Sequence, residues 1–212
     1  MEHAVTWTSN AEAPPGAWRR ADDEALTPIL STARDLFYEV GFHGTSVRDI
    51  ARRVGVTVPA IYYHHANKEA ILAALLDRSI RSVISRCEQA LSEAGPDPAD
   101  RFRNLIECLV LYMANHRKSG SMDGEIRALS PAARKQYSAQ RRRVEQMLVD
   151  TIAQGSATGV FEVASPQETA RALLGMIQAV TRWFEPGGGR LSAEELAARY
   201  VDIAAHTVGL RA

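Results

Sequence analysis

The residues best suited to chemistry form one short run in which hydroxyl, imidazole and ammonium groups follow closely. Tyr62, Tyr63 and His64 supply donors at the end of a predicted helix, and Asn67 and Lys68 open the next one. A cation at a helix N-terminus is unfavourable unless an anion compensates it. A phosphate group meets this need, because it also accepts from the free N–H groups of the helix end. The run therefore predicts a phosphate-contacting surface, and the phosphates of DNA fit it.

Two short predicted helices position this run. Thr45 or Ser46 caps the first helix, Gly55 ends it, and Thr57 caps the second helix with Pro59 in its first turn. The first helix has an apolar stripe that consists of Val47, Ile50, Ala51 and Val54. Two helices joined by a short turn containing glycine form the DNA-reading helix-turn-helix, whose second helix enters the major groove. The pattern predicts such a unit.

The stretch from Gly41 to Leu72 resembles the N-terminal domain of TetR-type transcriptional regulators. The matching elements are Ala33, Leu36-Phe37, Gly41-Phe42, Thr45-Ser46-Val47-Arg48-Asp49-Ile50-Ala51, Gly55-Val56, Ile61-Tyr62-Tyr63-His64, Asn67-Lys68-Glu69 and Leu72. The resemblance implies a ligand-responsive repressor that binds palindromic, double-stranded operator DNA as a homodimer. A small, largely apolar effector would release it from DNA.

The resemblance also implies DNA contacts for individual residues. Phosphate contacts are expected from Thr45, Ser46, Thr57, Tyr63, His64 and Lys68. Contacts with base edges or thymine methyl groups are expected from Val58, Pro59, Tyr62 and, at a guanine, Arg48. His65 stands where the family usually has Phe, and it either weakens the packing there or adds a phosphate contact. Few of these side chains can read bases by hydrogen bonds, so part of the specificity is expected from DNA shape.

Other conspicuous residues are interpreted as structural. His64 and His65 diverge by about 100° on a helix, so they are poorly placed to share a metal ion. Cys87 and Cys108 lie on apolar helix faces and are interpreted as buried, inert thiols, with a nucleophile or a redox switch as the alternative. The run Gly187–Arg190 lacks the Lys-Ser/Thr of a phosphate loop and is interpreted as a flexible connection. No catalytic motif is present, so we expect neither an enzyme nor a cofactor or metal site.

Helical periodicity runs along the chain from residue 22, and no strand pattern interrupts it. We predict an all-α fold with about nine helices, at 23–40, 47–54, 58–64, 67–93, 98–117, 121–128, 131–157, 166–185 and 193–209. The predicted divisions are a disordered tail over 1–21, a three-helix helix-turn-helix domain over 22–66, and a helical ligand-binding and dimerisation domain over 67–212.

Several helix starts can be read from capping patterns. Thr27-Pro28 either caps the first helix or lies inside a first turn begun by the acidic residues 22–24. Capping boxes are predicted at Ser165–Glu168 and at Ser192–Glu195.

The last two predicted helices carry apolar residues on more than one face. In the helix over 166–185, Met176, Ala179 and Trp183 form a stripe beside a larger one. Because a helix with two apolar faces needs two partners, we expect these helices to form a four-helix dimer interface. The predicted interface residues are Leu173, Ile177, Val180, Thr181, Phe184, Leu196, Tyr200 and Ile203.

The middle helices are expected to enclose the effector. Candidate pocket residues, each with a core role as the alternative, are Leu109, Tyr112, Met113, Ile126, Met147, Ile152, Met176 and Trp183. Arg127 and Arg182 are candidate anchors for an acidic group, and Arg141–Arg143 form either a solvated face or a contact with an anionic ligand or partner subunit. The ending Arg182–Gly188 with Leu191-Ser192 and Tyr200 resembles TetR-type regulators of lipid and steroid-ring catabolism, which implies an acyl-CoA effector.

Charge and composition limit the remaining possibilities. The 212 residues include 25 Lys and Arg against 25 Asp and Glu, and residues 18–81 are nearly balanced too. DNA affinity is therefore expected to depend only modestly on salt. The N-terminus has no signal-peptide pattern, and no apolar run reaches the length of a membrane span. We expect a cytoplasmic protein without a membrane partner. The alternatives are an all-α enzyme or ligand-binding protein that does not read DNA, and a DNA-binding protein without an effector.

Overall fold

The structure is a computed structural model that describes residues 14–21, 26–188 and 191–210 of the chain. Its helices, in chain order, are η1 (Ala17–Arg19), α1 (Pro28–Gly44), α2 (Val47–Val54), α3 (Val58–His64), α4 (Lys68–Glu93), α5 (Pro98–Asn115), α6 (Arg117–Ser121), η2 (Met122–Ala128), α7 (Pro131–Ala157), α8 (Pro166–Trp183) and α9 (Ala193–Thr207), where η1 and η2 are 3-10 helices. The described part contains no strand, which confirms the predicted all-α class.

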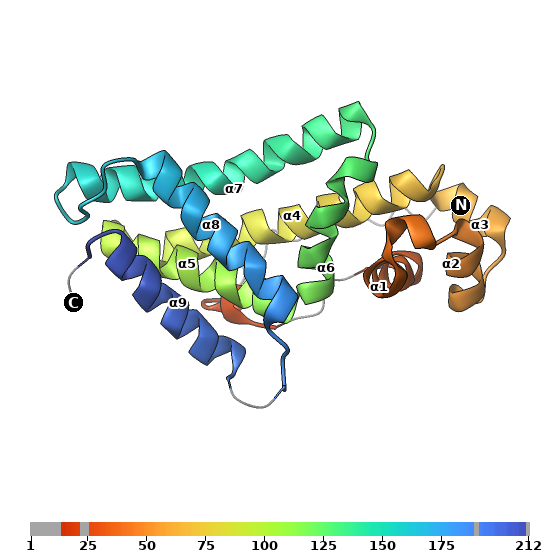
Figure 1. Cartoon of the computed structure of the whole chain (residues 1–212), viewed down its shortest axis with the longest axis horizontal. Helices are drawn as coiled ribbons and strands as arrows, with labels where there is room; N and C mark the ends of the chain where they lie inside the picture. Colours follow the sequence, from red (N-terminus) through yellow and green to blue (C-terminus); the bar gives the residue numbers. More distant parts are fainter. Residues whose placement is uncertain (1–13, 22–25, 189–190, 211–212) are drawn as a thin grey trace, which may run out of the picture.

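The helices form a small head and a larger body (Figure 1). The head consists of α1, α2 and α3 at one end of the molecule. The long helix α4 begins in the head and runs into the body, where it packs against α5 and α7. Helix α8 packs against α5, α6 and α7, and α9 packs mainly against α5. One continuous helix therefore joins the two parts.

The caps of the head follow local sequence closely. Thr27 accepts from the backbone of Leu30, so the Thr27-Pro28 pair caps α1 and does not lie inside its first turn. The expected acidic start at residues 22–24 lies outside the described residues. Helix α1 also continues past the predicted end at residue 40, across a kink at Gly41, whose φ of 81° suits glycine.

Two details of local structure in the body differ from the prediction. The helix predicted over 121–128 is present as the 3-10 helix η2, and the short helix α6 directly before it was not predicted. Ser165 makes no cap to the backbone of α8, and its hydroxyl donates to the Glu168 carboxylate instead. The capping box at Ser192 and Glu195 is present as predicted.

The expected disordered tail is also partly ordered. Residues 14–21 contain η1 and pack against α4 and α5, while residues 1–13 lie outside the described part. Trp18 is 1% exposed, which is incompatible with a solvated tail. The local sequence, rich in Ala, Pro and Gly, gave no sign of this docking because the partners lie far along the chain.

Within the described residues, no helix is both long enough and apolar enough to cross a membrane.

Candidate nucleic-acid interface and ligand pocket

The head is held together by a small apolar core. Phe37, Ile50 and Ile61 of its three helices are buried, with Ala51 beside them. Gly55 ends α2 in the left-handed conformation at φ 82°, and Thr57 then caps α3 by accepting from the backbone of Ala60. This turn fixes the direction of α3 relative to α2, which is the geometry of a helix-turn-helix.

Helix α3 presents aromatic side chains to solvent. Tyr63 is 87% exposed and Tyr62 is 51% exposed, and the His64 ring meets the Tyr63 ring edge-on at a centroid distance of 5.1 Å. Large exposed aromatic side chains on one short helix are typical of a surface that another molecule covers. Most of the predicted DNA-contacting residues share this exposure, namely Ser46, Arg48, Thr57, Pro59, Tyr62, Tyr63 and His64, while Val58 is half-buried.

Thr45 and Lys68 are oriented differently from the prediction. Thr45 is 2% exposed, and its hydroxyl donates to the carbonyl oxygen of Gly41. The Lys68 Nζ donates to the carbonyl oxygens of Phe42 at 2.6 Å and Thr45 at 2.7 Å, and it lies over the Phe42 ring. These groups supply the negative potential that the sequence argument assigned to a phosphate. In this structure, both side chains tie the end of α1 to the start of α4.

His65 is half-buried directly after α3, and burial together with the neighbouring His64 lowers the pKa of His65. The lowered pKa disfavours the charged imidazolium. Both the packing role and a phosphate contact from the neutral ring are compatible with this position.

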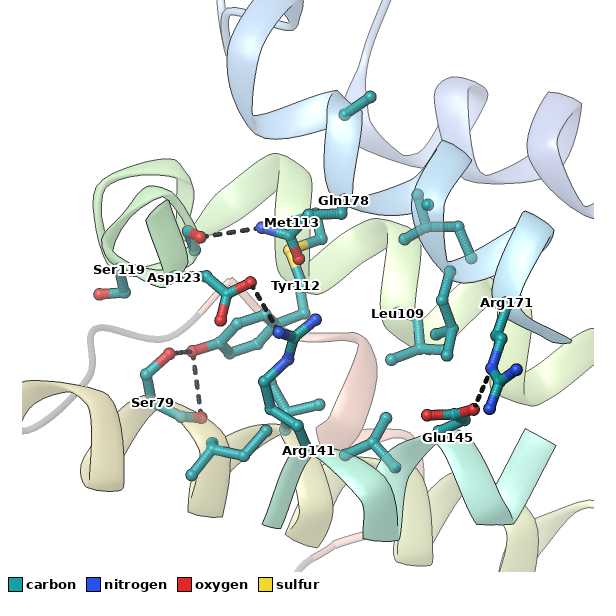
Figure 2. Close-up of a pocket in the computed structure, with 18 of the residues that line it drawn as sticks. Ser79, Leu109, Tyr112, Met113, Ser119, Asp123, Arg141, Glu145, Arg171 and Gln178 are labelled. Atoms are coloured by element: carbon teal, nitrogen blue, oxygen red, sulfur yellow. Dashed lines mark hydrogen bonds and ion pairs between the residues drawn. The ribbon is translucent and has the colours of Figure 1, made fainter. Parts of the chain in front are cut away.

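The body contains a cavity of about 440 Å³ between α4, α5, α7 and α8, closed at one end by α6 and η2 (Figure 2). Its apolar lining includes Ile80, Val83, Leu109, Met113, Val144, Leu174 and Ile177. The hydroxyls of Ser79 and Tyr112, both buried, are 2.8 Å apart at its floor. An apolar cavity with a few polar groups is the usual form of a small-molecule site.

Charged groups are concentrated in the part of the cavity lined by α7, α8 and η2. Arg141 pairs with Asp123 at 3.4 Å, and Arg171 pairs with Glu145 at 3.0 Å, as Figure 2 shows. The Tyr137 hydroxyl donates to Asp123, and burial together with this carboxylate raises the pKa of Tyr137. Arg182, also in the lining, makes no ion pair with any described residue. The cavity therefore combines apolar walls with arginine side chains that can receive an anion.

Only four of the ten predicted pocket residues line this cavity, namely Leu109, Tyr112, Met113 and Arg182. Ile152 is completely buried in the core, and Arg127 and Trp183 are exposed outside the cavity. The half-buried residues Ile126, Met147 and Met176 also lie outside its lining. Sequence reasoning did not find Asp123, Tyr137 or Gln178, and of the three consecutive arginines only Arg141 reaches the cavity.

Most of the residues predicted for the dimer face are not accessible on the surface of the single chain. Six of the eight predicted interface residues are buried within their own chain, namely Leu173, Ile177, Val180, Thr181, Phe184 and Leu196. The large exposed apolar residues on α8 and α9 are Trp183, at 54%, which was predicted for the pocket, and Ile203, at 47%, which was predicted for the dimer face. Helices α8 and α9 contact each other, and burial raises the pKa of Tyr200 on α9.

One segment contacts both the cavity and the head. Ser119, Gly120 and Asp123 of α6 and η2 line the cavity. From the same segment, Lys118 pairs with Asp35 of α1 at 2.9 Å, and the Glu125 carboxylate accepts from the backbone N–H of Phe42 at 3.4 Å. A change in the position of this segment would therefore act directly on α1.

Comparisons with known proteins agree over both parts of the chain. Residues 29–75 match the family model described as bacterial regulatory proteins, tetR family, and residues 95–208 match that of the tetracyclin repressor-like C-terminal domain. The transcriptional repressor KstR2 of Mycobacterium tuberculosis is 26% identical over 181 residues, which cover 82% of this chain and 88% of that protein.

Solved structures show the same arrangement. The regulator PfmR from Thermus thermophilus superposes with a TM-score of 0.77 at 32% identity, covering 84% of this chain and 97% of that one. AibR, solved in complex with isovaleryl coenzyme A and operator DNA, gives a TM-score of 0.74 at 27% identity, covering 82% of this chain and 95% of that one.

Proposed function

Because the chain belongs to the TetR family of bacterial transcriptional regulators, we propose that it is a homodimeric repressor that an effector in the body cavity releases from operator DNA. The family consists of regulators and not of enzymes. The observation that carries the proposal is the double contact of residues 117–128, which line the cavity and also pair with α1. Because residues 117–128 contact both the cavity and α1, a ligand bound in the cavity could change the position of the head.

The exposed face of the head is the proposed DNA surface. Tyr62, Tyr63 and Pro59 of α3 would enter the major groove, with Arg48 of α2 reaching a base edge and Ser46 and Thr57 contacting phosphates. The free N–H groups at the start of α2 and α3 support phosphate contacts without a large positive charge. Lys68 and Thr45 are assigned to holding the head in shape, because Thr45 is buried and the Lys68 ammonium donates to two backbone carbonyl oxygens within the head.

The cavity favours an apolar effector that carries an anionic group. The apolar walls would bind an acyl or ring system, and Arg141, Arg171 and Arg182 would contact the anion. An acyl-CoA thioester has both parts, since its phosphates are anionic and its acyl group is apolar. AibR, whose structure holds isovaleryl coenzyme A, provides a precedent on the same fold.

The proposed release mechanism is a shift of α6 and η2. An effector that reaches Asp123 competes for Arg141 and moves the segment that carries Lys118 and Glu125. The effector acts only if it binds the DNA-incompetent arrangement better than the DNA-bound one. The change in α1 would then alter the separation of the two α3 helices in the dimer.

The exposed faces of α8 and α9 are the proposed dimer contact. Trp183, Met176 and Ala172 lie along one side of α8, and Tyr200 and Ile203 continue this surface on α9. A two-fold dimer fits DNA reading, because two half-sites about 34–36 Å apart then receive one α3 each. We place its action in the cytoplasm, where it would meet operator DNA.

The experiment that tests this function measures binding of the dimer to DNA flanking its own gene, using fluorescence anisotropy with a panel of acyl-CoAs. We expect tight binding without ligand and release by at least one acyl-CoA. Binding that no member of the panel changes would contradict the effector proposal, and failure to bind DNA would favour a ligand-binding protein on the same fold.

A further inference from the structure

Two cysteines from neighbouring helices face each other inside the body. Cys87 on α4 and Cys108 on α5 are both fully buried. The register of these helices is fixed on either side of them: Tyr112 meets Ser79, and the Asn104 side chain donates to the carbonyl oxygen of Ala90 at 3.1 Å. Because α4 and α5 run antiparallel between these two contacts, Cys87 and Cys108 lie at matching heights. The cavity, the head and the dimer face make no use of either thiol.

Burial keeps the thiols of Cys87 and Cys108 unreactive. A hydrogen bond with Cys108 and complete burial raise the pKa of Cys87. The thiolate, not the thiol, is the nucleophile in disulfide chemistry, so a raised pKa suppresses reaction with oxidants. Reaction therefore requires a local opening that admits water and oxidant to the two sulfur atoms.

The N-terminal strap, defined as residues 14–21, crosses α4 and α5 at this level. The Trp18 Nε1 donates to the Glu93 carboxylate on α4 at 2.8 Å, and Arg19 pairs with Glu107 on α5 at 2.7 Å. Arg86 donates to the carbonyl oxygens of Trp18 and Arg20. Arg86 and Glu107 are the immediate chain neighbours of Cys87 and Cys108. In Figure 1 the strap, in red, lies against the body and away from α1.

The N-terminal strap is attached mainly by partly exposed polar contacts, whereas the core of the body is held by buried apolar side chains. Arg19 and Glu107 are partly exposed, as are the backbone groups that Arg86 and Gln89 hold. Trp18 is the strap's buried side chain. A short segment held by one buried ring and several exposed polar contacts belongs to the parts of a protein that open locally at low free-energy cost.

We propose that Cys87 and Cys108 form a disulfide-forming site, covered by the N-terminal strap and opened to hydroperoxides when the strap lifts. One thiolate attacks the peroxide oxygen and releases hydroxide or alkoxide, giving a sulfenic acid. The second thiol then displaces water from that sulfur. In total, two thiols and one peroxide give one disulfide, one water and one further water or alcohol.

The bond would join two walls of the cavity. Val83, one turn before Cys87, and Leu109, directly after Cys108, both line it. A disulfide between Cys87 and Cys108 would prevent α4 and α5 from moving relative to each other beside the cavity. The same helix α4 continues into the head, so oxidation would act on the connection between cavity and DNA surface.

The test exposes the full chain to hydrogen peroxide and then alkylates it with a maleimide after denaturation. Intact mass separates the dithiol, which takes two maleimides, from the intramolecular disulfide, which takes none. The strap is loosened in two ways, by Trp18→Ala and by the double change Glu93→Gln with Glu107→Gln. Asp100→Asn on α5 is the control, because Asp100 pairs with Arg103 and does not hold the strap. Circular dichroism verifies that each variant is folded.

We expect the disulfide in the wild-type chain, and about tenfold faster formation in both strap variants than in the control, because lost hydrogen bonds to charged groups favour local opening. Cys108→Ser should give no intramolecular bond and should leave Cys87 as a sulfenic acid that dimedone traps. If folded strap variants keep two free thiols after peroxide treatment, the disulfide site is refuted. Equal rates in the strap variants and the control would refute the covering role of the strap.

Discussion

The Lys118 ammonium on α6 lies 2.9 Å from the Asp35 carboxylate on α1, and this pair joins the wall of the body cavity to the head. Residues 119 and 120, which follow Lys118 directly, line the cavity. The pair spans 83 positions of the sequence and connects the two parts of the molecule at a place separate from α4. It is therefore a contact through which the proposed effector would act on the head.

Lys118→Met should weaken the response to effector while leaving DNA affinity in its absence close to wild type. The variant removes the attraction between α6 and α1, so movement of α6 is transmitted less fully. The measurement is the effector concentration needed for half-release of labelled DNA, compared with Lys135→Met on the exposed face of α7. The same half-release concentration in both variants would contradict the coupling role of Lys118.

Acidic pH should weaken the response to effector, as Lys118→Met is expected to do. Burial opposes ionisation of Asp35, but the hydrogen bond from Lys118 and the charges of Arg34 and Lys118 outweigh it, so the pKa of Asp35 is lowered. A lowered folded-state pKa stabilises the folded arrangement above the unfolded-state value, and this contribution is lost as pH falls through the folded value. The contact should persist at neutral pH and disappear only below the ordinary aspartate range. The measurement is the effector concentration for half-release of DNA as a function of pH. In the wild type this concentration should rise at acidic pH. In Asp35→Asn it should not change over the same pH range, because the titrating carboxyl group is absent.

Lys68→Met should destabilise the head. The variant removes two charged hydrogen bonds to the carbonyl oxygens of Phe42 and Thr45, and the expected cost is about 2 kcal/mol, allowing for partial access to solvent. Thermal unfolding measured by circular dichroism tests this, with Lys135→Met as the control. An unchanged melting temperature combined with weakened DNA binding would instead assign Lys68 to a phosphate.

Arg141→Gln should weaken binding of an acyl-CoA by about tenfold, because a charged hydrogen bond to an anion is lost. Arg143→Gln is the matched control, since Arg143 lies two positions along α7 and pairs with Glu88 outside the cavity. Isothermal titration with the same acyl-CoA compares the two variants. Equal losses of affinity would mean that general charge, and not the cavity geometry, attracts the ligand.

Trp183→Glu should convert the proposed dimer to a monomer, because it places a charge on the exposed apolar face of α8 and α9. The fold should be retained, since Trp183 is half-exposed in the single chain. Analytical ultracentrifugation measures the mass, with Val40→Glu on α1 as a control at another exposed apolar position. A Trp183→Glu protein that sediments as a dimer would locate the contact on a different surface.

The head was largely predictable from the sequence because its structure is local. Thr57 caps a helix that begins one residue later, and Gly55 ends a helix beside it. Such signals depend on side chains only a few positions apart. The orientation of Lys68 was not predictable, because its partner Phe42 lies 26 residues earlier and is brought close only by the kink at Gly41.

The body was predictable in class but not in detail. Helix α8 is apolar on two sides, and the sequence period alone does not reveal which side faces the core. Ile177 is buried and Trp183 is exposed, although both are large apolar residues on the same helix. The docking of Trp18 against Glu93, 75 positions away, likewise depends on tertiary packing that no local pattern encodes.

Whether the exposed face of α3 reads DNA can be measured with Tyr63→Ala. The Tyr63 side chain is 87% exposed, so its removal should leave the melting temperature close to wild type. The measurement is the anisotropy-derived affinity of wild type and Tyr63→Ala for DNA flanking the gene, at one fixed salt concentration. We predict a loss of about tenfold or more in the variant. Equal affinity of the two folded proteins for that DNA would contradict the account.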